Sequence, residues 1–292
     1  MTNTRKTCLI TGCSKGGVGE ALAEAFRDKG YHVFVTARST NKIPEPLHDA
    51  SNVTVLALDV SSSRSIAAAA KVIQSETGGK LDVLINNAGL GMEMPVLDTS
   101  IAEAKKLFDV NFFGALEMTQ VFSPMLIKAE GCIVNNSSVG GRFPIPFIGT
   151  YQATKAALIQ TSEVLRLEVA PLNVRVLTLI TGGITTNFLA NIPTLLLPEN
   201  SYYHGIRNII EEQPQQVPFG VSPNKFAGEV LYQVEKGTTG KYWIGGATGF
   251  ARLSLWLLPD WLLDRFSLSQ KPFTKKLAEE HGKRTAQDTK LD

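Results

Sequence analysis

The amino-acid sequence predicts one α/β domain built on a doubly wound parallel sheet, followed by an apolar C-terminal extension. Short apolar runs alternate with helical patterns along the chain, which is the rhythm of βαβ units. The runs hold few polar residues, as strands do when helices cover both faces of a parallel sheet. A glycine cluster separates the first run from the first helical pattern. We expect the domain to cover residues 1–244 and the extension to cover residues 245–292.

The expected strands are the apolar runs at residues 7–11, 31–37, 53–58, 81–85, 132–136 and 174–180. Helical patterns fill residues 18–29, 100–127 and 151–170, and an alanine-rich helix follows the three serines at 61–63. A serine there can cap the helix by accepting a hydrogen bond from its first amides, and Gly78 and Gly79 can end it.

Composition and charge favour a globular protein that does not bind nucleic acid. The 292 residues are 43% hydrophobic and 19% charged, which suits a globular core. A formal net charge of +2 is too small to predict a nucleic-acid partner. Cys8, Cys13 and Cys132 lack paired spacing, so we expect reduced thiols and no metal site. Polar residues 1–6 lead into the first strand without a secretory pattern, which predicts a cytosolic start.

A glycine-rich loop, Thr-Gly-Cys-Ser-Lys-Gly-Gly-Val-Gly at residues 11–19, joins the first strand to the first helix. Backbone amides and the positive end of a helix can hold a pyrophosphate there, and glycines leave room for its approach. The alternative is an ordinary turn, but the strand-to-helix context favours a Rossmann-type dinucleotide site. The residues expected to contact the cofactor are Gly12, Ser14, Lys15, Gly17 and Gly19.

Arg38 follows the second strand, where dinucleotide-binding proteins often place an acid that binds the ribose 2′-hydroxyl. An arginine accommodates a 2′-phosphate instead, and Lys15 adds a second positive charge from the loop. The pair predicts NADPH rather than NADH. The alternative is that both are solvated surface charges.

The same loop also matches Gly-x-Ser-x-Gly at residues 12–16, a motif that places a hydrolase nucleophile on a strand-to-helix turn. Ser14 is therefore an alternative nucleophile for a lipid ester hydrolase. Such a serine needs a histidine and an acid elsewhere in the chain. The sequence gives no clear context for that role to any of its histidines, which are His32, His48, His204 and His281.

Tyr151 and Lys155 lie one helical turn apart, so their side chains share a face of the predicted helix. We expect the ammonium to lower the pKa of Tyr151 towards neutrality and to make it a catalytic acid/base. Tyr232 also has a lysine four residues on, but 13 residues before it stands Phe219. The position 13 residues before Tyr151 is Ser138, at the end of the fifth strand, where its hydroxyl can bind a substrate carbonyl.

Asn111 lies among apolar residues in the long helical pattern, although asparagine is unfavourable inside a helix. A polar role is therefore expected. Either the amide is a satisfied structural group, or it opens the helix and holds a water that leads to Lys155.

In this order and spacing, these residues resemble the short-chain dehydrogenase/reductase family over residues 7–244, together with Asp59-Val60 and Asn-Asn-Ala-Gly at 86–89. The resemblance implies reduction of a carbonyl to an alcohol with hydride transfer from the B face of the nicotinamide. Ser138, Tyr151, Lys155 and Asn111 would be the catalytic set. A protein that binds NADPH without catalysis is a further alternative.

The resemblance also implies the remaining cofactor contacts. Asp59 and Val60 would border the adenine, and Tyr151 and Lys155 would touch the nicotinamide half. Two departures stand out: a glycine pair at 16–17, and Thr-Gly at 181–182 in place of the family's Pro-Gly. The other implied contacts are Asn87, Ala88, Gly89, Ile184 and Thr186.

The segment expected to form a substrate lid, about residues 184–216, is rich in leucine and isoleucine. Either it receives a lipophilic substrate or it packs on its own core. The chain looks most like fungal NADPH-dependent 1-acyldihydroxyacetone phosphate reductases of endoplasmic reticulum and lipid droplets, which points to a lipid carbonyl. Fungal reductases of polyketide or terpenoid alcohols and ketones look similar.

Residues 243–266 hold all three tryptophans of the chain and are followed by a polar tail. The run is interrupted and too short for a membrane-spanning helix. It suits a peripheral membrane or lipid-droplet contact, a contact between copies of a homo-oligomer, or a lid over the active site.

Overall fold

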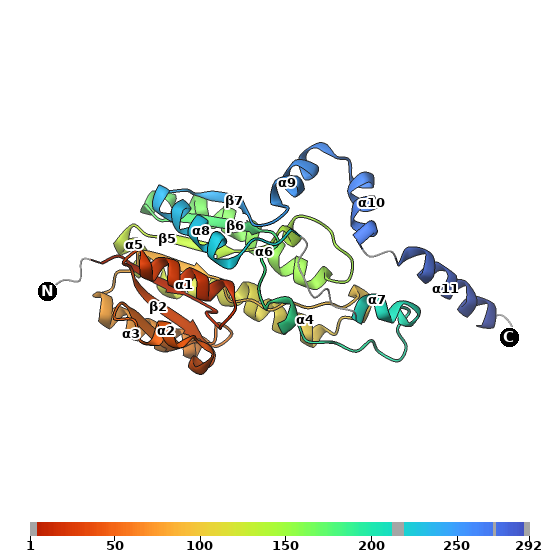
Figure 1. Cartoon of the computed structure of the whole chain (residues 1–292), viewed down its shortest axis with the longest axis horizontal. Coiled ribbons are helices and arrows are strands. Elements are labelled where there is room, and N and C mark those ends of the chain that lie inside the picture. The colour runs from red at the N-terminus through yellow and green to blue at the C-terminus, as the bar shows by residue number, and fades with distance from the viewer. Residues whose placement is uncertain (1–4, 212–218, 271–272, 289–292) are drawn as a thin grey trace.

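The computed structural model describes residues 5–211, 219–270 and 273–288. Within these residues, seven parallel strands form one sheet in the order β3-β2-β1-β4-β5-β6-β7 (Figure 1). The order reverses between β1 and β4, as in a doubly wound α/β fold, which confirms the predicted class. The strands are β1 (Thr7–Ile10), β2 (His32–Ala37), β3 (Val53–Ala57), β4 (Val83–Asn86), β5 (Cys132–Asn136), β6 (Arg175–Thr181) and β7 (Gly240–Ile244).

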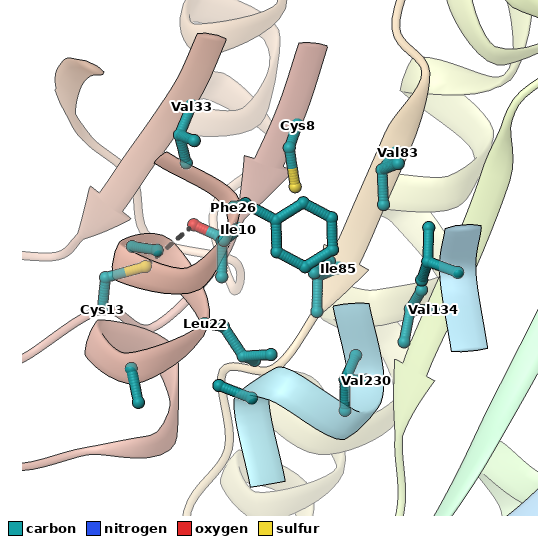
Figure 2. Close-up of a cluster of buried hydrophobic side chains, with 14 of the residues drawn as sticks. Cys8, Ile10, Cys13, Leu22, Phe26, Val33, Val83, Ile85, Val134 and Val230 are labelled. Atoms are coloured by element: carbon teal, nitrogen blue, oxygen red, sulfur yellow. Dashed lines mark hydrogen bonds between the residues drawn. The ribbon is translucent and has the colours of Figure 1, made fainter. Parts of the chain in front are cut away.

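Helices cover both faces of the sheet. Those on one face are α1 (Val18–Asp28) and α8 (Pro223–Lys236), and those on the other are α3 (Ser63–Thr77), α5 (Gly114–Ala129) and α6 (Gly149–Val169). In β1, Cys8 and Ile10 face the first layer while Leu9 faces the second. This alternation explains why the strands are apolar at nearly every position. Figure 2 shows Phe26 of α1 and Val230 of α8 among the side chains of the cluster on this face, together with Ile10 and Ile85.

Most predicted elements lie within two residues of the observed ones, but the predicted helix 100–127 is not continuous. It consists of α4 (Ile101–Phe108), a π-helical segment (Asp109–Phe113) and α5. The predicted alanine-rich helix is confirmed: the Ser62 side chain accepts a hydrogen bond from the Ser65 amide, and Gly78 ends the helix in the left-handed conformation. Helix α6 begins two residues earlier than predicted.

The shorter elements lie in the connections. Helix α2 (Glu45–His48) follows β2, and α7 (Arg207–Glu211) lies in the expected lid, of which residues 212–216 are outside the described residues. The 3-10 helices are Thr40–Lys42, Val96–Asp98, Val139–Gly141, Ala170–Leu172, Leu189–Asn191 and His204–Ile206.

Three helices follow the last strand: α9 (Thr248–Leu257), α10 (Asp260–Gln270) and α11 (Thr274–Asp288). Figure 1 shows α9 and α10 as a helical pair beside the body and α11 extending beyond it. Residues 271–272 and 289–292 of the predicted polar tail lie outside the described residues. Across the ranges that the structure describes, no helix has both the length and the apolar character to cross a membrane.

Candidate active site

Most predicted site residues lie at or just beyond the carboxyl ends of β1, β2, β3, β4, β5 and β6, whereas Asn111 lies in the π-helical segment and Tyr151 and Lys155 lie on α6. Parallel strands place these ends along one edge of the sheet, and the reversal of strand order between β1 and β4 opens a crevice there. The structure therefore brings together residues that are up to 175 positions apart in the sequence, from Thr11 to Thr186.

The glycine loop connects β1 to α1 and depends on close backbone approaches. Gly12 has φ +75°, and a Cβ on it would lie 2.8 Å from the Ala88 Cα. A Cβ on Gly19 would collide with the Gly12 carbonyl oxygen. Gly17 is the N-cap residue of α1, and no side chain caps the helix there. The first amides of α1 can therefore donate hydrogen bonds to a bound anion.

The two glycines of the pair at 16–17 have different conformations in the structure. Gly16 has φ +75°, donates its amide to the Glu20 carboxylate, and lies against Asn187 from the far side of the loop. Gly17 has an ordinary extended conformation and starts the helix. Gly16 therefore needs the conformation that favours glycine, while Gly17 is the residue that begins α1.

Arg38 and Lys15 are both exposed at the edge of the crevice. Burial acts to raise the pKa of Asp59, but hydrogen bonds from Ser61 and the nearby charge of Arg38 outweigh it and lower that pKa. Arg38 thus lies close enough to Asp59 for their charges to interact, beside the end of β3. Val60 is buried and packs against Gly114 of α5.

The loop after β4 is held against the glycine loop by polar contacts. The Thr11 hydroxyl accepts hydrogen bonds from the amides of Asn87 and Ala88, both at 3.0 Å. The Asn87 side chain donates to the Thr11 carbonyl at 2.9 Å and accepts from the Asn136 side chain at 2.9 Å. A Cβ on Gly89 would lie 3.6 Å from the Lys155 Nζ. These contacts fix one wall of the crevice.

Tyr151, Ser138 and Lys155 are brought together as predicted. The Ser138 side chain lies close enough to the Tyr151 phenol to act on its pKa. Lys155 is buried and donates from Nζ to the Asn136 carbonyl oxygen at 2.9 Å, and its Nζ lies 5.9 Å from the centre of the Tyr151 ring. Both tyrosine and lysine belong to the first turns of α6, which directs them to the same side.

The expected pKa of Tyr151 is not what the structure gives. Burial raises the pKa of Tyr151 above its usual value of about 10, and the effect of Ser138 only partly opposes this. Burial also lowers the pKa of Lys155 to about 8. Lys155 is not among the causes of this shift in the pKa of Tyr151, and burial outweighs the effect of Ser138, so Tyr151 keeps its proton at pH 7.

Asn111 is buried in the π-helical segment, and both of its side-chain donors and its oxygen have hydrogen-bond partners. It accepts from the Leu90 amide at 2.8 Å and donates to the Leu90 carbonyl at 2.9 Å and to the Thr154 hydroxyl at 3.1 Å. Both predicted alternatives are therefore met in part: the amide is satisfied and the helix is opened. With both of its donors engaged, the amide can hold a water only by accepting a hydrogen bond at Oδ1.

The Thr-Gly departure after β6 has a structural role that the sequence did not indicate. The Thr181 hydroxyl donates to the Asn136 side-chain oxygen at 2.6 Å, which a proline could not do. Asn136 thereby links Thr181, Asn87 and Lys155, although it was not predicted as a site residue. Its one sequence signal is a polar residue at the end of an apolar strand.

The two predicted contacts in the segment after β6 have different surroundings. Ile184 is buried against the core and bridges to Val221. Thr186, together with Gly16 and Gly17, lines a surface depression of about 520 Å³ that contains Glu20 and Glu24 and none of the predicted catalytic residues.

Three of the four histidines have hydrogen bonds to residues other than Ser14. The hydrogen bonds of His32, His48 and His204 go to Thr54, Thr40 and Glu199. Among the described residues, no group of three or more potential metal-binding side chains comes together.

The substrate side of Tyr151 is apolar. Its ring lies 6.3 Å from the ring of Phe188 in the lid, and it packs on a cluster that includes Met94, Phe147 and Ile206. Phe273, just before α11, stacks on Phe147 at 4.7 Å, so the C-terminal extension contributes to this wall. The lid therefore packs on a core and also faces Tyr151.

The residues present fit a nicotinamide dinucleotide. The uncapped start of α1 and the close glycine contacts leave backbone amides and space for a pyrophosphate, and Gly89 leaves room beside Lys155. Such a cofactor supplies a hydride when bound. Tyr151 and Ser138 supply two hydroxyls on the same side of the crevice, where they can hold the oxygen of a carbonyl or alcohol.

Comparison with known proteins agrees with this geometry. A family model described as short chain dehydrogenase matches residues 6–195. "Short-chain dehydrogenase ptmH" of Penicillium ochrochloron is 41% identical over 265 residues, which cover 89% of this chain and 96% of that protein. The "NADPH-dependent 1-acyldihydroxyacetone phosphate reductase" of Schizosaccharomyces pombe is 38% identical over 233 residues, 78% of each chain.

Two solved structures are similar over almost the whole chain. A short-chain dehydrogenase from Streptomyces avermitilis has a TM-score of 0.75 and 29% identity, covering 94% of this chain and 97% of that one. A short chain dehydrogenase from Burkholderia cenocepacia in complex with NADP has a TM-score of 0.71 and 25% identity, covering 91% and 98%. The hydrolase alternative for Ser14 is wrong, because the family model covers that loop as part of an oxidoreductase.

The matched model, the relatives and the arrangement around Tyr151 agree, and the chain belongs to the short-chain dehydrogenase/reductase family of nicotinamide-dependent oxidoreductases.

Proposed function

We propose that this chain is an NADPH-dependent reductase that converts a carbonyl of a lipophilic substrate to an alcohol. The observation that carries the proposal is the setting of Tyr151. Its hydroxyl lies near the Ser138 side chain, while its ring packs against the apolar lid and lies 6.3 Å from Phe188. A substrate beside Tyr151 therefore meets hydroxyls at its carbonyl and apolar side chains around the rest.

The protonation states support the direction of reduction. Because burial raises the pKa of Tyr151, the phenol carries a proton at neutral pH and can donate it to a substrate oxygen. Ser138 is placed to hold that oxygen through a hydrogen bond. Lys155 lies on the same face of α6, where its ammonium can stabilise the phenolate left behind.

The preference for NADPH rests on Arg38 and Lys15. Both are exposed cations at the ends of β2 and β1, where a 2′-phosphate would lie. A relative from Schizosaccharomyces pombe has NADPH in its name, and the structure from Burkholderia cenocepacia holds NADP. These relatives support the same cofactor here.

The substrate proposal has two forms. The relative named a 1-acyldihydroxyacetone phosphate reductase supports an acylated ketone phosphate. Relatives from Penicillium and Talaromyces carry only the description short-chain dehydrogenase at 41–43% identity, and they support the alternative of a ketone or alcohol from a polyketide or terpenoid pathway.

The test is a panel assay with the purified full chain. NADPH oxidation is followed by absorbance with an acyl-dihydroxyacetone phosphate and with hydrophobic cyclic ketones. We expect turnover of at least one class, and a loss of about 10²- to 10⁴-fold in Tyr151→Phe because the proton donor is removed. Tyr232→Phe is the matched control, since Tyr232 is 57% exposed on α8 with a lysine on the next turn.

Wild-type turnover in Tyr151→Phe would contradict the proposal. Tight NADPH binding with no turnover of any carbonyl in the panel would instead favour the non-catalytic alternative.

A further inference from the structure

A cavity of about 390 Å³ lies between α9 and α10. None of the predicted catalytic or cofactor-binding residues lines it. Two aromatic contacts define its base: Phe266 of α10 lies 5.5 Å from Phe250 of α9 and 5.7 Å from Phe143. The rest of the apolar wall consists of Leu258, Leu262 and Leu263.

The size and lining of the cavity suit one flexible chain. At about 30 Å³ for each water-sized group, it holds about 13 such groups, which is close to a medium-length alkyl chain. One turn of a partner helix, about 5.4 Å long and 10 Å across, would fill about 400 Å³. The cavity therefore cannot admit more than a single turn of a protein helix, whereas an extended aliphatic chain fits.

The polar groups of the cavity indicate the head of the ligand. Arg265 lines the cavity, is exposed and forms no salt bridge among the described residues. Ser254 also lines it and is buried. No acidic side chain lines the described cavity, so its charge is positive. An anionic group bound to Arg265 would satisfy that charge while its chain lies among the leucines.

We infer that the α9–α10 cavity binds the aliphatic chain of a single anionic amphiphile, with its carboxylate or phosphate on Arg265. The site is separate from the cofactor crevice and does not depend on the proposed reaction. It does share one wall with the catalytic loop, because Phe143 lies between Ser138 and Tyr151. The Phe143 carbonyl also accepts a hydrogen bond from Gln152, beside Tyr151.

The test uses 11-bromoundecanoate and its neutral twin 11-bromoundecanol, both kept below the concentration at which they aggregate. The bromine quenches tryptophan fluorescence at short range, and Trp256 and Trp261 lie on the two helices of the cavity. We expect saturable quenching of the full chain by one equivalent of the carboxylate, without NADPH or turnover. The alcohol should bind about tenfold more weakly, because it lacks the charge-assisted bond to Arg265.

Three variants test whether the probes bind in the cavity or elsewhere on the surface. Arg265→Glu should weaken the carboxylate about tenfold or more and leave the alcohol unchanged. Arg252→Glu is the matched control, since Arg252 is exposed on α9 and does not line the cavity. Ser254→Phe should fill the cavity and weaken both probes, and its thermal unfolding shows whether the fold is kept.

The inference is overturned if quenching by the carboxylate does not saturate, or if Arg265→Glu and Arg252→Glu bind it equally. It is also overturned if quenching occurs only when the probe is carried in phosphatidylcholine vesicles, because the helices would then contact a lipid surface rather than a single molecule. Ser254→Phe that keeps its fold and binds both probes like the wild type would exclude the cavity as well.

Discussion

Lys155 shows at the scale of one residue how the fold sets the chemistry. Its ammonium has one hydrogen bond to protein in the structure, to the Asn136 carbonyl, and burial lowers its pKa to about 8. The ordinary value is about 10.4. The lysine is therefore charged at pH 7 and becomes neutral in mildly alkaline solution.

This gives a pH dependence with a defined sign. Below pH 8 the ammonium is present and can stabilise the developing phenolate of Tyr151; above pH 8 it is lost. We expect kcat/KM for NADPH, which reports groups of the free enzyme, to fall as the pH rises through about 8. In Lys155→Arg the charge persists to higher pH, so its residual activity should not fall near that pH. If kcat/KM of Lys155→Arg still falls near pH 8, the fall must come from the titration of another group.

Arg38 provides the second residue-scale prediction. Arg38→Asp should lower kcat/KM for NADPH by about 10- to 100-fold, because a charge-assisted bond to the 2′-phosphate is lost. The new carboxylate should improve the use of NADH, since it can bind the ribose hydroxyls. Steady-state rates with both cofactors measure the change. Lys71→Asp, an exposed lysine on α3, is the control, and an equal loss in both variants would show a general charge effect.

At the scale of one element, the break between α4 and α5 depends on Asn111. Its amide bonds residues 21 and 43 positions away, Leu90 and Thr154. These contacts fasten the π-helical segment to the loop after β4 and to α6, beside the active site. Gly114 then lets α5 approach Val60, because a Cβ there would lie 2.7 Å from the Val60 carbonyl oxygen.

Asn111→Leu should therefore affect stability and activity together. The Leu90 amide and carbonyl would lose buried partners, which costs about 2–4 kcal/mol in the free energy of unfolding. Urea unfolding and kcat on the same preparation measure both effects. Asn111→Asp keeps the acceptor for the Leu90 amide and should lose less stability. Full stability with lost activity in Asn111→Leu would show that the amide acts on the chemistry alone.

The elements also show what could be predicted from the sequence. The inner strands were predictable because both of their faces are buried, so these strands are mostly apolar. Tyr151, Ser138 and Lys155 were predictable because a helical turn and a strand end fix their spacing. The π-helical segment, the bond from Thr181 to Asn136 and the raised pKa of Tyr151 depend on distant contacts or burial. These three features could not be predicted from the neighbouring residues in the sequence.

At the scale of the whole molecule, the crevice lies where the two halves of the sheet meet, between the layers that cover its two faces. The Asn87 side chain connects the loops after β1 and β5, and two apolar clusters lie on opposite faces of the same strands. A ligand bound at this edge contacts several elements at once. Its binding free energy is therefore added to the stability of the whole fold.

NADPH at about 100 times its Kd should raise the free energy of unfolding by about 2.7 kcal/mol, or the melting temperature by roughly 5 °C for a domain of this size. Gly12→Ala should abolish most of the shift, because Gly12 has φ +75° and lies against Ala88. Gly30→Ala is the matched control: Gly30 has φ +95° but nothing within 4 Å of an added Cβ. It should melt lower and keep the full shift in differential scanning fluorimetry. Equal shifts in both variants would place the cofactor away from this loop.

All three cysteines of the chain are buried: Cys8 in β1, Cys132 in β5, and Cys13 in the glycine loop. Burial raises the pKa of Cys13 to about 12 and that of Cys132 to about 11. Thiols react with oxidants and alkylating reagents as thiolates, so the folded chain resists both. Alkylation of this protein therefore measures how often it opens. Since Cys13 lies on the loop and Cys132 in the centre of the sheet, their relative labelling rates separate local opening of the loop from unfolding of the whole chain.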